Sequence, residues 1–83
     1  MNTTEDVYRF VQRLKAESER QGEVSLASRL DDALNLGSSG LEILGAIRQA
    51  ILENRTAIER LLGPDGDVEA RQIVSFVDRA FGR

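Results

Sequence analysis

The 83-residue chain carries 11 basic and 14 acidic side chains, which gives a net charge of −3, and it contains no histidine and no cysteine. Histidine is the commonest general base, and both residues are common metal ligands, so Ser-His and Cys-His catalysis, His or Cys metal sites and disulfide-held scaffolds are excluded. The acidic balance supplies no long-range attraction to nucleic acid or to an anionic membrane.

Hydrophobic residues make up 41% of the chain and charged residues 30%, a mixture typical of one soluble globular domain, here residues 1–83. Residues 1–6 are acidic and lack the basic and apolar segments of a secretion signal, and no apolar run reaches the length of a spanning helix. We therefore expect a cytoplasmic protein that does not enter the membrane.

The first predicted helix covers residues 4–21. Thr3 or Thr4 can cap its amino end, and Gly22 can adopt the left-handed conformation that stops a helix. Its apolar residues fall in an arc of about 100°, the width of one buried stripe. They are Val7, Phe10, Val11 and Leu14.

The second predicted helix covers residues 24–36 and is ended by Gly37. One side of this helix is apolar, and most of its charged residues lie opposite. The apolar side contains Leu26, Ala27, Leu30, Ala33 and Leu34.

A third helix is predicted over residues 40–62, where Ser39 and Glu42 match a capping box. Counted from its cap, this helix would be about 36 Å long and would form the spine of the domain. Its apolar residues recur at alternating spacings of three and four, with one polar exception. The series is Leu44, Ile47, Ile51, Asn54, Ile58 and Leu61.

The fourth helix is predicted over residues 67–81, after a type I turn at 63–66 with Pro64 in its second position. Its apolar residues span about 160° of the circumference, more than one neighbouring helix can cover. We expect this helix to close the core from one end.

The fold class expected from these segments is all-α, a single four-helix domain with a long third helix as spine. Short loops favour antiparallel neighbours. The predicted core consists of Val7, Phe10, Val11, Leu14, Leu26, Leu30, Leu34, Leu44, Ile47, Ile51, Ile58, Ile73, Val77 and Phe81.

Asn54 admits two interpretations. In one, two copies of the third helix pair and a buried Asn54 sets their register, as polar residues do in coiled coils. In the other, the same stripe packs on the remaining helices of its own chain and Asn54 lies at the rim. The sequence favours burial within the chain but leaves pairing open.

A candidate interface lies beyond the edge of the main stripe of the third helix. Leu41 and Leu52 are apolar there, and Arg48 and Arg55 flank Leu52. A leucine framed by two arginines suits an acidic partner or a subunit interface, although an ordinary solvated margin has the same composition. With Asn54, these are the candidate interface residues.

The segment around Gly37 also has the outline of a helix-turn-helix, which makes a nucleic-acid-binding regulator the alternative function. The residues that would face a DNA groove are Ser38, Ser39, Gly40, Leu41 and Glu42. The first basic residue is Arg48, and Glu42 would meet phosphate repulsion, so nucleic acid is an unfavoured partner.

Residues 26–48 resemble a two-helix segment of small, uncharacterised bacterial all-helical proteins. The resemblance rests on the pairs Leu26-Ala27, Arg29-Leu30 and Ala33-Leu34, on Gly37 and on the turn at 40–44. It covers about a quarter of the chain and implies a helical fold, without an activity.

No group of residues predicts an enzyme, a catalytic residue, a cofactor or a metal site. The adjacent acids Asp31 and Asp32 point about 100° apart on a helix, and Asp65 and Asp67 suit a turn better than a calcium loop. The expected function is a small protein-protein interaction module that associates with itself as a homodimer or binds another protein. The expected binding surface is the outer side of the third helix together with the fourth helix.

Overall fold

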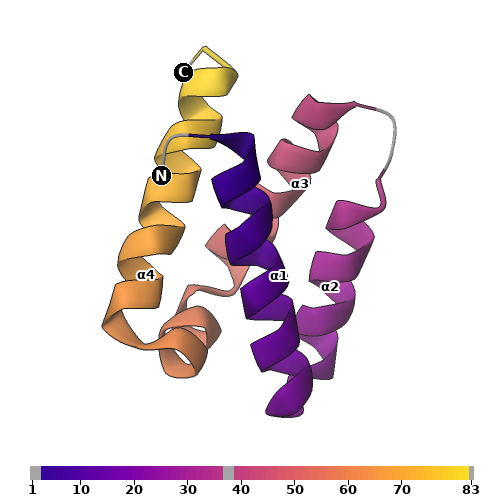
Figure 1. The fold of residues 1–83 in the computed structure, drawn as a ribbon, viewed down its shortest axis with the longest axis vertical. Helices are drawn as coiled ribbons and strands as arrows, with labels where there is room; N and C mark the ends of the chain where they lie inside the picture. Colours follow the sequence, from indigo (N-terminus) through magenta and orange to yellow (C-terminus); the bar gives the residue numbers. More distant parts are fainter. Residues whose placement is uncertain (1–2, 37–38, 83) are drawn as a thin grey trace.

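The computed structural model describes residues 3–36 and 39–82, and within them the chain forms four α-helices and no strand (Figure 1). The helices are α1 (Thr4–Arg20), α2 (Val24–Leu34), α3 (Gly40–Glu53) and α4 (Arg55–Ala80). The prediction of an all-α, four-helix fold is confirmed. The longest helix is α4, however, so the prediction of a long third helix as spine is wrong.

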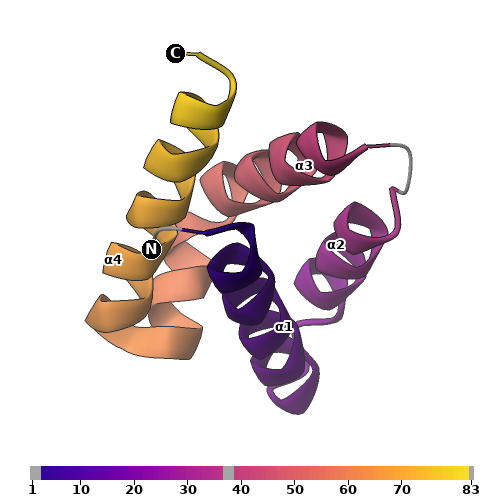
Figure 2. The ribbon, with the colours of Figure 1, turned by 45° about the horizontal axis from the view of Figure 1, so that its top comes forward.

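The helices surround a shared core in chain order. α1 packs against α2 and α4, and α3 packs against the same two helices. In Figure 1, α1 lies in front, with α2 on one side and the later part of α4 on the other. α3 crosses behind α1 obliquely, as the turned view in Figure 2 also shows. This arrangement brings the carboxyl-terminal half of α4 alongside α3.

Both ends of α1 follow from local chemistry. Thr3 has an extended conformation, and its Oγ1 accepts a hydrogen bond from the Asp6 amide at 3.1 Å, which satisfies one of the amides at the helix start. Gly22 has φ of +78°, the left-handed conformation predicted for the stop. Lys15 Nζ lies 2.9 Å from Asp31 Oδ1 and ties α1 to α2.

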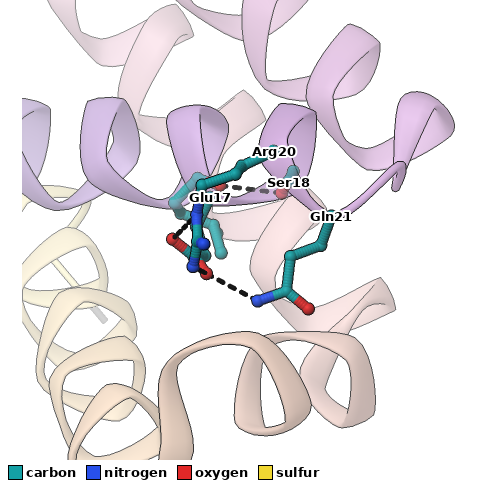
Figure 3. A network of polar contacts seen from close by, with 5 residues as sticks. Glu17, Ser18, Arg20 and Gln21 are labelled. Atoms are coloured by element: carbon teal, nitrogen blue, oxygen red, sulfur yellow. Dashed lines mark hydrogen bonds and ion pairs between the residues drawn. The ribbon is translucent and has the colours of Figure 1, made fainter.

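A polar cluster covers the last turn of α1 (Figure 3). The Glu17 carboxylate accepts hydrogen bonds from the Arg20 guanidinium and, at 2.6 Å, from Gln21 Nε2. These donors lower the pKa of Glu17, with Arg20 as the main cause. Ser18 is fully buried next to them, and its hydroxyl donates to the Leu14 carbonyl at 2.7 Å. The cluster therefore satisfies its polar groups locally.

The predicted third helix at 40–62 is wrong in its carboxyl end, because α3 stops at Glu53. Asn54 takes a non-helical conformation, and its Nδ2 donates to the Ala50 carbonyl at 2.8 Å. Asn35 ends α2 in the same way, by a 2.8 Å bond to the Asp31 carbonyl. Asn54 thereby satisfies a carbonyl that the ended helix would otherwise leave without a partner, whereas the Asp31 carbonyl also accepts from the backbone amide of Asn35 at 3.1 Å.

The break at Asn54 lets the next residues return to the core. An unbroken helix of about 36 Å would extend along the whole 34 Å length of the molecule. With the break, Ile58 is fully buried and Leu61 is 8% exposed. Asn54 is thus a helix terminator within one chain, and its predicted place in a continuous seam is not observed.

α4 bends sharply at Gly63, which has φ of +78° and ψ of −175°, a conformation that is essentially restricted to glycine. Pro64 follows as the first residue of the next helical turn, where a missing amide hydrogen costs nothing. The predicted break in the helix is therefore present at Gly63, but the predicted linker at 63–66 is too long and the predicted helix start at 67 is too late. Residues 64–66 already belong to α4, and only Gly63 is non-helical.

The bend places Leu62 directly over the buried Gly66. A Cβ atom added to Gly66 would lie 2.2 Å from the Leu62 Cβ, a distance that no packed structure tolerates. Glycine at position 66 is therefore a packing requirement, which the sequence prediction treated only as the end of a turn.

Most of the predicted core is buried, with two corrections. Leu34 is only partly buried, since it is the last residue of α2. Phe81 is 40% exposed, because α4 ends at Ala80 and the ring lies on α3 beside Gly45. Leu61 and four alanines belong to the core in addition: Ala27, Ala33, Ala50 and Ala70. The predicted helix stop at Gly37 lies outside the described residues.

Candidate protein-binding surface

The outer side of α3 is built by helical spacing. Leu41, Gly45, Arg48 and Leu52 follow one another at intervals of four, three and four, so they share one side of the helix. The buried residues Leu44, Ile47 and Ile51 lie on the neighbouring side of the helix, toward the core. The start of this helix is capped as predicted, since Ser39 Oγ accepts from the Glu42 amide at 3.1 Å.

α4 runs antiparallel to α3 along this outer side. Near the start of α3, a Cβ atom added to Gly45 would lie 3.4 Å from the Phe81 ring. One turn later, Arg48 Nε donates to Asp78 Oδ1 at 2.7 Å. Arg48 is therefore engaged within the chain and does not offer its charge freely to a partner.

Next to Arg48, toward the end of α3, a groove of about 230 Å³ lies between the two helices. Its floor contains the buried side chains of Ile51 and Ala70, and Leu52 contributes an apolar wall that is 39% exposed. We call this site the α3–α4 groove. The remaining residues that line it are Arg55, Arg71, Val74 and Ser75.

The two arginines of the groove share one acid. Arg55 Nη2 lies 3.5 Å from Asp67 Oδ1, and Arg71 Nη2 lies 2.9 Å from Asp67 Oδ2. The Asp67 side chain is 14% exposed, whereas those of Arg55 and Arg71 are 47% and 66% exposed. The rim of the groove therefore presents more positive than negative charge to the solvent.

The structure brings together only some of the candidate interface residues. Leu52 and Arg55 line the α3–α4 groove, and Arg48 borders it through its ion pair with α4. Leu41 is 49% exposed but lies about three turns away, near the start of α3. Asn54 ends α3 instead of contributing to a helix seam.

Asp67, Arg71, Val74 and Ser75 were not chosen as individual interface residues from the sequence. The signal was the wide apolar arc of the fourth helix, which includes Val74 and predicted that this helix contributes to the binding surface. Their position opposite Leu52 depends on the bend at Gly63 and on the register between α3 and α4. Neither is encoded in local periodicity.

Acidic side chains of the described residues form ion pairs and not a metal-binding group. Within residues 3–36 and 39–82, no three acidic side chains are placed to hold a metal ion. Glu17 and Glu53 have lowered pKa values because arginines donate to them, Arg20 in the first case and Arg29 in the second. Carboxylates held in their charged form serve as ion-pair partners and not as proton donors near neutral pH.

The start of α3 shows no feature that favours DNA binding. Leu41 and Glu42 are exposed there, and Arg48 is paired with Asp78. A helix that reads DNA needs free basic or amide side chains in its first turns. The helix-turn-helix alternative gains no supporting observation from this geometry.

Comparison with models of protein families, with curated proteins and with solved structures finds no match to this chain. In the part of the chain that the structure describes, no helix combines the length and the apolarity needed to span a membrane.

Proposed function

We propose that this protein is a small, non-enzymatic protein-protein interaction module that associates with itself. The observation that carries the proposal is the outer side of α3, which leaves Leu41 and Leu52 49% and 39% exposed on a helix whose other side is buried. Exposed apolar side chains grouped along one helix are typical of surfaces that bind proteins.

Leu41 is the best candidate for contact between two copies. It lies at the end of the molecule where α3 begins and α4 ends, and Phe81, 40% exposed, lies over Gly45 one turn further along α3. Covering such a side chain stabilises a complex by about 1 kcal/mol for every 40 Å² of apolar surface removed from water. The cysteine-free composition is compatible with a cytoplasmic setting, where disulfides are rare.

Light scattering coupled to size exclusion, across a tenfold range of concentration, tests self-association. We expect a dimer for the wild-type chain and a monomer for Leu41→Glu, because a carboxylate would have to be buried in the contact. Val24→Glu is the matched control, since Val24 is 73% exposed on α2. Circular dichroism of each variant checks that its helices remain.

Two results would contradict this proposal. A wild-type chain that is monomeric at every concentration would exclude self-association. A dimer that persists unchanged in Leu41→Glu would place the contact on another part of the molecule.

A further inference from the structure

The α3–α4 groove combines an apolar interior with a cationic rim, and this combination defines the chemistry of its occupant. We infer that the groove binds an acidic, amphipathic segment of another protein, with one apolar side chain against Leu52 and Val74 and with carboxylates that meet Arg55 and Arg71. The inference rests on the proposed function, because it names a class of partner for the interaction module.

The size of the groove suits a side chain and not a small-molecule ligand. Sites for drug-sized molecules usually enclose about 300 to 1,000 Å³, whereas this groove has about 230 Å³ and is open along one side. Four of its lining residues are apolar, and the backbone on both sides is helical. A peptide that places one or two apolar side chains between two helices fits these dimensions.

The charge of the rim selects an acidic segment. The carboxylate of Asp67 forms ion pairs with one nitrogen of Arg55 and one of Arg71, and each guanidinium has five N–H donors in all. The remaining donors of these half-exposed to exposed side chains can bind incoming carboxylates in a bidentate manner. The whole chain has a net charge of −3, so this excess of positive charge is a local feature of the groove.

A second copy of the chain is a poorer occupant of the groove. Most homodimers have two-fold symmetry, in which the same surface meets itself. Such a contact at the groove would place Arg55 and Arg71 near the same arginines of the other copy, and like charges across an interface are unfavourable. Self-association at Leu41, about three turns away, leaves the groove available.

A designed peptide tests the inference. The probe is a fluorescein-labelled 16-residue amphipathic helix with leucines at helical spacing and glutamates on both sides of them. The matched probe has lysine in place of every glutamate, and a single-stranded oligonucleotide of equal negative charge tests for general anion binding. Fluorescence anisotropy measures affinity for the full chain, and amide chemical shifts of the isotope-labelled protein locate the site.

We expect the acidic peptide to bind with salt-sensitive affinity and to shift the amides of Leu52, Arg71, Val74 and Ser75. Changing Arg55→Gln and Arg71→Gln together should weaken binding about tenfold, because each exposed ion pair contributes a factor of about two to five to the affinity. Leu52→Gln should weaken it by about tenfold as well. Arg9→Gln is the control, because it removes one positive charge and one exposed ion pair on α1, away from the groove.

Several outcomes would overturn the inference. These are no binding of the acidic peptide at about 1 mM, equal binding of the lysine peptide or of the oligonucleotide, and unchanged affinity in the double arginine variant. Groove amides that shift with protein concentration alone would show a second copy in the groove, which would refute the inference while supporting self-association. A monomeric chain that binds the acidic peptide would refute self-association and leave the inference standing.

Discussion

The α1–α2 hairpin and the α3–α4 half of the molecule change the direction of the chain by different means. In the hairpin, α1 ends next to Gly22, whose φ of +78° stops the helix, and the chain turns once in solvent. In the other half, the chain breaks at Asn54 and bends again at Gly63, also with φ of +78°, but this second bend packs Leu62 onto Gly66.

The difference shows where local chemistry suffices to explain a helix end. Gly22 has open space around it, so its conformation alone explains the glycine. Gly63 and Gly66 act as a pair. Gly63 supplies the backbone conformation of the bend, and Gly66 leaves the space that the Leu62 side chain occupies. The candidate protein-binding surface lies on the less regular half, where the bend positions Asp67 and Arg71 beside Arg55.

The largest effect is expected at Gly66. Gly66→Ala should lower the free energy of unfolding by about 3 kcal/mol, because a methyl group would overlap Leu62 and force the two helical turns apart. Urea denaturation measures this change. Gly40→Ala is the control, since nothing lies within 4 Å of the position and its φ is not positive, so little change is expected. Equal stabilities of the two variants would refute the packing role of Gly66.

A smaller effect is expected at Asn54 and Asn35, the asparagines that end α3 and α2. Asn54→Ala should lower the free energy of unfolding by about 1 to 2 kcal/mol, because the Ala50 carbonyl loses its donor in a partly buried site. At the exposed Asn35, the Asp31 carbonyl keeps the backbone amide of residue 35 as a donor. Water can replace the lost side chain as well, so Asn35→Ala should cost less than about 0.5 kcal/mol. Thermal denaturation measures the loss of stability in both variants. Equal losses in Asn54→Ala and Asn35→Ala would show that burial of the asparagine has no role.

The smallest effect is expected from acidification. Glu53 of α3 accepts hydrogen bonds from Arg29 of α2 and from Gln49, and these donors, Arg29 first, hold the pKa of Glu53 below its ordinary value of 4.5. A lowered folded-state pKa stabilises the fold above the ordinary value, and this contribution is lost as pH falls through the folded-state pKa. Glu17 behaves in the same way within α1.

Thermal melts between pH 7 and pH 3 measure this contribution. We expect the midpoint of the wild-type chain to fall slightly on acidification, and to fall less in Glu53→Gln and in Glu17→Gln, which cannot titrate at that position. The Glu53 side chain is 46% exposed and that of Glu17 is 22% exposed, so water screens both ion pairs and the differences should be small. A variant whose midpoint falls as steeply as that of the wild-type chain would show that its carboxylate makes no net contribution.

The candidate site was only partly accessible to sequence reasoning. Leu52 and Arg55 could be chosen because an apolar residue beside an arginine at the edge of a helical stripe is visible in the sequence. Arg71 could not be linked to them, because it lies 16 positions further along the chain than Arg55, and only the bend at Gly63 brings the two to one carboxylate. The same bend brings Val74 into the groove with Leu52.

The sequence by itself determined the all-α class, the starts of α1 and α3, the stop at Gly22 and most of the core. These features depend on hydrophobic period and on contacts between residues three or four apart, which are properties of short segments. Tertiary structure decided that α3 ends at Asn54, that α4 bends without a linker and that the groove lies beside Leu52. Those features depend on how far a helix can extend before it leaves the core, and on which side chains neighbouring helices bring together.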